Sequence, residues 1–257
     1  MPTRKKLIVG NWKMNGSLAT NQTLLEALKA HHDPDVAQVA VCPSFPYLAQ
    51  ARVVLGGSSI EWGAQDVSLE ASGAFTGDVS AAMLRDLGCR YVIVGHSERR
   101  HGRAETDDMV AAKAVRALSS GLTPIVCVGE TLQDREAGRA EFVVKRQLSA
   151  VIHAVGHCAS EIVVAYEPVW AIGSGLSATP EQAQAVHAVL RAQLNAAVPS
   201  SARNRILYGG SMNPANAHAL LVQPDIDGGL VGGASLIADQ FLAIVAACAV
   251  AVSSPSE

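Results

Sequence analysis

The chain has 257 residues, of which 49% are hydrophobic and 17% are charged. Because an average globular domain carries about 25% charged residues, this composition excludes intrinsic disorder and predicts a large buried core. The formal net charge is -3, and the Lys and Arg residues are scattered along the chain, which excludes the broad basic face that nucleic-acid binding requires.

Short β-branched apolar runs alternate with longer Ala- and Leu-rich stretches of helical period along the whole chain. We expect eight of each kind. The predicted strands are residues 6–11, 36–42, 60–64, 91–95, 124–128, 162–167, 205–209 and 226–231. Most of these runs are apolar throughout, which is typical of parallel strands buried on both faces.

Residues between the strands carry helix-start signals. Thr179 stands at a predicted N-cap, with Pro180 at the first helical position and Gln182 where it can complete a capping box. Asn213 followed by Pro214 is expected to open another helix in the same way. The apolar run 241–252 is shorter than the ~20 residues that cross a bilayer, so we expect a buried C-terminal helix and no membrane partner.

Linkers, charge blocks and low-complexity tracts do not interrupt this alternation, so residues 1–257 are expected to form one domain. Eight βα units of this length predict an α/β fold, a closed single-domain (β/α)8 barrel of the TIM type. An open doubly wound sheet is the alternative. In a barrel, the loops after the strands converge on one rim, and candidate residues should lie there.

Four charged or titratable residues pass this test. Lys13 is the one lysine of six just past a strand end, and His96 is the one histidine of eight that directly ends a predicted strand. Glu167 ends another strand, and the following Pro168 prevents a helix from continuing there. Glu130 also follows a strand, so position alone does not single out Glu167.

The other histidines are assigned structural places. We expect His31, His32, His187 and His218 within or at the ends of helices, on solvated faces. His153 and His157 share a helical spacing that metal ligands use, but no third ligand is evident nearby, and no metal is expected.

Two glycine clusters, residues 208–211 and 230–235, follow the seventh and eighth strands. Glycine lets the backbone approach a ligand, and amides at a helix start favour phosphate. Loops at these two places commonly bind phosphate in such barrels. Residues 173–178 match a dinucleotide fingerprint only formally, because five residues separate them from their strand.

The five cysteines are odd in number and widely spaced, without a Cys-x-x-Cys pair. This pattern favours a reducing compartment, so we expect a cytoplasmic protein. The apolar run 7–9 behind the basic start is too short for a secretory signal core.

Five segments together resemble the triosephosphate isomerase family nearly end to end. They are residues 10–15, residues 63–68 with 73–77, residues 94–100, residues 165–173 and the two glycine clusters. The resemblance implies interconversion of dihydroxyacetone phosphate and D-glyceraldehyde 3-phosphate through an enediol, in glycolysis and gluconeogenesis. It implies a phosphosugar substrate and no cofactor.

The resemblance also implies a role for each matched residue. Glu167 would be the base, and His96 a neutral electrophile kept unprotonated by the helix N-terminus it faces. Lys13 would supply positive charge, Asn11 a hydrogen bond, and Glu98 would lie behind these groups. Backbone amides that would hold the substrate phosphate belong to Gly173, Ser174, Ser211, Gly232 and Gly233.

Two loops of the family have counterparts here. Residues 168–178 resemble its lid, which excludes water. Residues 65–78 resemble the loop that members insert into a second subunit, which implies a homodimer with Gln65 and Thr76 as contacts. The chain departs from the family pattern at Leu176 and Ser177 of the lid, and elsewhere at the positions Asp66 and Gly229.

Two other hypotheses about the function of the chain stay open. Another phosphosugar barrel enzyme would need metal ligands on several strand ends or a Schiff-base lysine near the barrel centre, and neither is visible in the sequence. A catalytically idle barrel would be expected to lack one of Lys13, His96 and Glu167, and all three are present.

Overall fold

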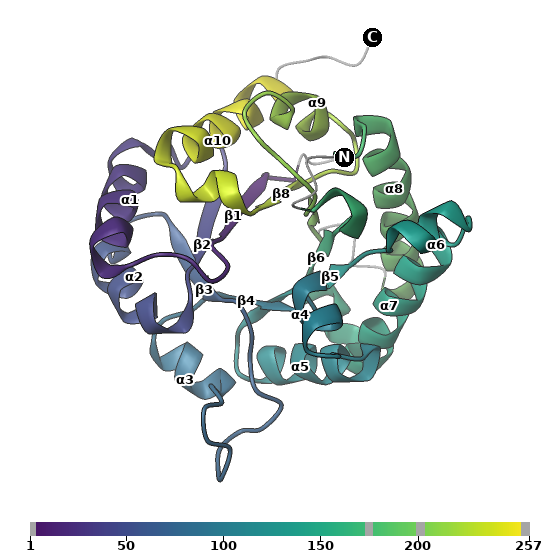
Figure 1. Cartoon of the computed structure of the whole chain (residues 1–257), viewed down its shortest axis with the longest axis horizontal. Helices are drawn as coiled ribbons and strands as arrows, with labels where there is room; N and C mark the ends of the chain where they lie inside the picture. The colour runs from purple at the N-terminus through teal and green to yellow at the C-terminus, as the bar shows by residue number, and fades with distance from the viewer. Residues whose placement is uncertain (1–3, 173–176, 199–203, 253–257) are drawn as a thin grey trace.

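Eight parallel strands close into a barrel, and helices surround it (Figure 1). The structure, a computed structural model, describes residues 4–172, 177–198 and 204–252. The strands, each paired with the next and the last paired with the first, are β1 (Leu7–Asn11), β2 (Gln38–Cys42), β3 (Glu61–Ala64), β4 (Tyr91–Val94), β5 (Thr123–Val128), β6 (Val163–Tyr166), β7 (Ile206–Tyr208) and β8 (Gly228–Val231). The closed barrel is confirmed, and the open-sheet alternative is wrong.

Every predicted strand is present, and only β5 begins earlier than expected, by one residue. The described residues contain more helices than the eight expected. The two additional ones are short: α4 (Ser97–Gly102) precedes the long helix after β4, and α6 (Leu132–Glu136) precedes the long helix after β5. The α-helices are α1 (Leu18–His31), α2 (Leu48–Leu55), α3 (Ala81–Asp86), α4 (Ser97–Gly102), α5 (Asp107–Ser119), α6 (Leu132–Glu136), α7 (Ala140–Val155), α8 (Pro180–Ala197), α9 (Ala217–Leu221) and α10 (Ala238–Val252).

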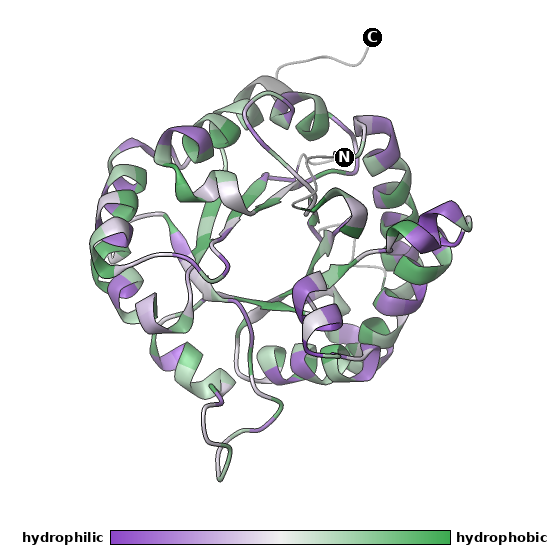
Figure 2. Cartoon of the chain, in the orientation of Figure 1, coloured by the Kyte–Doolittle hydropathy of each residue, from purple (hydrophilic) through white to green (hydrophobic). Residues whose placement is uncertain are grey.

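The strands bury both faces, as their unbroken apolar runs predict. One set of side chains packs inside the barrel, including Leu7 and Val9 of β1 and Val163 and Ala165 of β6. The alternate set faces the helices and joins the larger core between the two layers. Figure 2 shows the strands mostly in the hydrophobic colour and the outer helices mixed. Because side chains alternate along a strand, each strand aims every second residue at the barrel axis.

One of the two helix-start predictions is confirmed. Thr179 caps α8 with the full capping box that pairs it with Gln182. The prediction for Asn213 is wrong, because α9 begins at Ala217. The Asn213 side chain instead accepts hydrogen bonds from the amides of Ala215 and Asn216, which closes a turn before the helix.

The C-terminal helix α10 buries Phe241, Ile244 and Cys248 as expected. Within the described part of the chain, none of the helices combines the length and the apolar character that a membrane span needs.

The expectation of a solvated face is wrong for His187. Its side chain is fully buried on α8, edge-on to the Tyr166 ring at 5.8 Å, and its Nδ1 lies 3.2 Å from the carbonyl oxygen of Asp225. The helical period places this residue on the buried face of α8, where it contacts Tyr166 of β6, which the residue type alone did not reveal.

Candidate active site

The carboxyl ends of the strands carry a pocket of about 380 Å³. The inward series of β1 continues through Asn11, and that of β6 continues one residue past the strand to Glu167. The amide of Glu167 still donates to the carbonyl of Val128, so the parallel ladder holds this residue in line. Expected site residues that line the pocket are Asn11, Lys13, His96, Ser211, Gly232 and Gly233.

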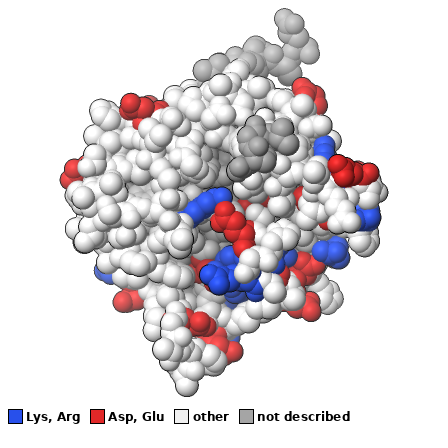
Figure 3. Space-filling view, viewed as in Figure 1, with Lys and Arg blue, Asp and Glu red and all other residues white. Residues whose placement is uncertain are grey.

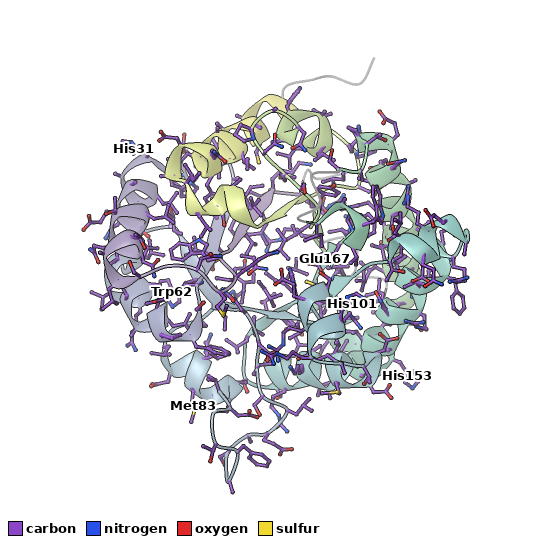
Figure 4. All side chains as sticks on the ribbon, viewed as in Figure 1. His31, Trp62, Met83, His101, His153 and Glu167 are labelled. Atoms are coloured by element: carbon purple, nitrogen blue, oxygen red, sulfur yellow. The ribbon has the colours of Figure 1, made fainter. Side chains whose placement is uncertain are left out.

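Glu167 lies near the centre of the ring of strands, whereas His31 and His153 lie on the outer surface (Figure 4). Its side chain is 2% exposed, and Oε2 accepts a hydrogen bond of 2.8 Å from the amide of Ser97. Oε1 lies 2.9 Å from Nε2 of His96 but accepts no well-aligned hydrogen bond. A buried carboxylate oxygen without a hydrogen-bond donor destabilises the folded chain, and such a group in a native structure calls for an explanation, such as a catalytic role.

His96 stands at the N-cap of α4. Its Nδ1 accepts a hydrogen bond of 3.2 Å from the amide of Glu98, so the lone pair is on Nδ1 and the proton of a neutral ring is on Nε2, facing Glu167. Burial lowers the pKa of His96, whereas the Glu167 carboxylate raises it, and the pKa lies above its usual value. The free site therefore does not favour the neutral ring as strongly as the helix N-terminus alone predicts.

Lys13 has a backbone φ of 52°, which residues other than glycine rarely adopt. Its amide donates to Oδ1 of Asn11 at 3.2 Å, and its Nζ lies 2.5 Å from Oε1 of Glu98. Oppositely charged side chains accordingly meet near the middle of the face seen in Figure 3. Glu98 thus contacts Lys13 and His96 directly.

The glycine loops form the wall opposite these groups. A Cβ at Gly232 would lie 3.5 Å from the Lys13 side chain, so the aliphatic part of that side chain runs along this loop. A Cβ at Gly209 would lie 2.9 Å from Cγ of Glu167, so glycine keeps room for the carboxylate. The Ser211 hydroxyl donates to the carbonyl of Ala171 at 2.6 Å. Gly173 and Ser174, expected at the phosphate, lie outside the described residues.

The structure separates the two strand-end glutamates that position alone did not. Glu130 is fully buried, and its Oε1 accepts hydrogen bonds from the Tyr166 hydroxyl at 3.0 Å and the Trp170 indole at 2.9 Å. Arg135 lies 3.3 Å from the same oxygen and 4.7 Å from the Trp170 ring centre. Glu130 therefore anchors the start of the expected lid and is not directed at the pocket.

The loop after β3 extends away from the ring of strands (Figure 1). Thr76 lies exposed on it, next to Phe75, whose side chain is 46% exposed. Gln65 lies at its base and contacts its own chain, since its Nε2 donates to the carbonyls of Lys13 and Cys42 at 2.9 and 2.8 Å. This contact was not foreseen from the sequence.

Two departures from the family pattern have a structural account. A Cβ at Gly229 would lie 2.7 Å from Sδ of Met212, so the Met212 side chain fills that space. Asp66 belongs to a network in which Lys113 lies 2.6 Å from both Asp66 and Glu105, and Arg99 also pairs with both. Burial raises the pKa of Asp66, an effect that the two cations oppose. Leu176 lies outside the described residues.

Comparison with known proteins agrees with this geometry. The family model described as Triosephosphate isomerase matches residues 6–248. Proteins named triosephosphate isomerase from Paracidovorax citrulli and Delftia acidovorans are 64% and 65% identical to the chain over 250 and 245 residues. These matches cover 96% and 95% of this chain and 100% and 99% of the relatives. A third, from Albidiferax ferrireducens, is 64% identical over 243 residues, covering 95% of this chain and 98% of its own length.

Proposed function

The chain belongs to the triosephosphate isomerase family, and we propose that Glu167, His96, Lys13 and Asn11 perform the reaction in the pocket at the carboxyl ends of the strands. The protein is an isomerase that interconverts dihydroxyacetone phosphate and D-glyceraldehyde 3-phosphate, a step of glycolysis. The observation that carries the residue assignment is the meeting of a buried carboxylate, an imidazole and an ammonium beside two glycine loops.

Glu167 is the base in this proposal. Its carboxylate leaves the Ser97 amide and removes a proton from the hydroxyl-bearing carbon next to the substrate carbonyl. The hydroxyl proton passes to the former carbonyl oxygen in the enediol, and the carboxylate returns its proton to the former carbonyl carbon. The poorly satisfied Oε1 supports such a movement. A buried carboxylate loses less solvation at this step than an exposed one would.

His96 polarises the carbonyl through the proton on Nε2. Once the Glu167 carboxylate turns to the substrate, it no longer raises the pKa of His96 as it does in the free site. Burial and the Lys13 charge, opposed by the Glu98 carboxylate, then favour the neutral ring. With Nδ1 accepting from the Glu98 amide, the Nε2 proton is donated to the oxygen as negative charge develops. Lys13 adds fixed positive charge, Asn11 adds a polar side chain at the pocket wall, and Glu98 orients Lys13.

The substrate phosphate is held by backbone amides of Ser211, Gly232 and Gly233, helped by Lys13. These residues line the pocket, and the η5 turn (Gly233–Leu236) begins at the second glycine, where unpaired amides favour an anion. Gly173 and Ser174 are assigned to the same group. Residues 168–178 form the lid, anchored at its start by Glu130.

The protein acts as a homodimer in this proposal. Met14 is 95% exposed and Phe75 is 46% exposed, and both stand on loops at the rim, where exposed apolar side chains mark an interaction surface. Thr76 would reach the partner's pocket, with Gln65 supporting the base of the loop. We assign residues 1–257 to one domain and the protein to the cytoplasm, and the number and spacing of its cysteines support this location.

A coupled assay tests the proposed chemistry. Purified protein treated with a chelator should interconvert the two triose phosphates without added metal or nucleotide. The Lys13→Met and His96→Gln variants should each lose activity by orders of magnitude while remaining folded. Wild-type turnover in either variant would reject that residue's role, and sedimentation of a monomer at assay concentration would reject the homodimer.

A further inference from the structure

The backbone of Lys13 is held in its unusual conformation by two side chains from neighbouring loops. The Lys13 carbonyl oxygen accepts a hydrogen bond from the Ser44 hydroxyl at 2.8 Å and another from Nε2 of Gln65 at 2.9 Å. Ser44 follows β2 and Gln65 follows β3, so two strand ends grip the loop that follows β1. Lys13 and Ala104 are the non-glycine residues with positive φ in the described part of the chain.

Neither side chain donates a hydrogen bond within its own loop in the described part of the chain. Ser44 is the N-cap of the short helix η1 (Phe45–Tyr47), yet its side chain makes no capping hydrogen bond and turns to Lys13. The Gln65 amide is divided between the carbonyls of Lys13 and Cys42. Both side chains therefore donate hydrogen bonds to the main-chain carbonyl of Lys13.

We propose that Ser44 and Gln65 are positioning residues that direct the Lys13 ammonium at the substrate by holding its main chain in the left-handed conformation. This inference rests on the role of Lys13 in the proposed function. With the carbonyl gripped and the amide bound to Asn11, the side chain starts from a fixed direction, along Gly232 to Glu98. Without the grip, the residue relaxes to an ordinary backbone conformation and the ammonium leaves the pocket wall.

Paired variants test the grip. Ser44→Ala should lower kcat/KM about fivefold, which corresponds to one hydrogen bond, and Ser44→Thr should restore it because the hydroxyl is kept. Gln65→Met, which removes both donors, should lower kcat/KM about tenfold or more. Ser119→Ala removes a matched contact, a serine hydroxyl on the main-chain carbonyl of Arg116 at 2.9 Å, and should leave kcat/KM unchanged.

A double-mutant cycle separates positioning from a structural role. The affinity for glycerol 3-phosphate, a phosphate ester that cannot react, is measured by calorimetry in each variant. Ser44→Ala should weaken binding in the wild-type chain and cause no further loss in Lys13→Met, because the residue acts through Lys13. Equal losses in both backgrounds, or full kcat/KM in Ser44→Ala and Gln65→Met, would overturn the proposal.

The same measurements distinguish failure of this inference from failure of the proposed function. If Lys13→Met retains wild-type kcat/KM and affinity, the proposed role of Lys13 is rejected, and with it the positioning role of Ser44 and Gln65. If Lys13→Met is strongly impaired while Ser44→Ala and Gln65→Met match the wild type, the role of Lys13 stands and the positioning proposal fails. Sedimentation of Gln65→Met shows whether assembly has also changed.

Discussion

Nε2 of His96 and Oε1 of Glu167 lie 2.9 Å apart in a buried site, so the charge of one residue sets the protonation of the other. The Glu167 carboxylate raises the pKa of His96 against the opposing effect of burial. This contact belongs to the free site, since the proposed reaction needs the carboxylate on the substrate and the ring neutral.

Glu167→Gln should lower kcat by several orders of magnitude, because the amide cannot accept the substrate proton. The affinity for glycerol 3-phosphate should remain, because the glycine loops and Lys13 are untouched. A coupled assay and calorimetry measure the two quantities. Loss of binding equal to the loss of turnover would contradict the division between base and anion site.

The same variant should lower the pKa of His96 in the free protein. The raising effect of the Glu167 carboxylate disappears, whereas burial and Lys13 still lower the pKa and only the Glu98 carboxylate still raises it. Titration of the imidazole resonances by NMR in wild type and variant measures the shift. An unchanged or higher pKa in Glu167→Gln would contradict the coupling.

Trp170→Phe should lower kcat/KM about tenfold by removing the indole hydrogen bond to Glu130 at the start of the lid. Trp62→Phe is the matched control. The Trp62 indole, on strand β3, also donates one hydrogen bond, at 3.0 Å, but to the main-chain carbonyl of Leu87 and away from the expected lid. The control should keep its kcat/KM. Equal effects of the two substitutions on turnover would argue against an anchoring role for Glu130.

Folding stability should decrease below neutral pH because of His187. Burial lowers its pKa from 6.5 to about 4, so the folded chain keeps the ring neutral while the unfolded chain takes up a proton. The stabilisation is complete above pH 6.5 and is lost as the pH falls toward 4, by about 3 kcal/mol.

Chemical denaturation between pH 7 and 4 measures this dependence. His187→Gln, which cannot titrate there and can still donate to the Asp225 carbonyl, should flatten the profile. His31→Gln, at an exposed site, should leave the profile as in the wild type. A wild-type slope in His187→Gln would assign the effect to other groups.

Lys113→Met should destabilise the fold by about 3 kcal/mol, because it leaves the buried Glu105 and the partly buried Asp66 with Arg99 as their remaining partner. Lys145→Met breaks only an exposed pair with Glu141 and should change stability by less than about 0.5 kcal/mol. Urea denaturation measures both. Comparable losses would show that the buried network contributes no more than a surface pair.

The sequence by itself determined the barrel and the strand ends. The unbroken apolar runs and the helical stretches between them are local patterns that depend only on neighbouring residues. They were enough to place Glu167 and Glu130 after strand ends, but not to choose between them. Lys13 and His96 were likewise identified from their places at strand ends. The same local signals failed at Asn213, where an N-cap residue closes a turn before the helix begins.

Only the tertiary structure decided that Glu167 lies against His96 whereas Glu130 binds Tyr166 and Trp170. It alone decided that His187 is buried and that Ser44 and Gln65 hold the Lys13 carbonyl. Each of these facts joins residues far apart in the chain. Their contact follows from closure of the barrel, which brings separate strand ends to one rim, and no local pattern records which side chains meet there.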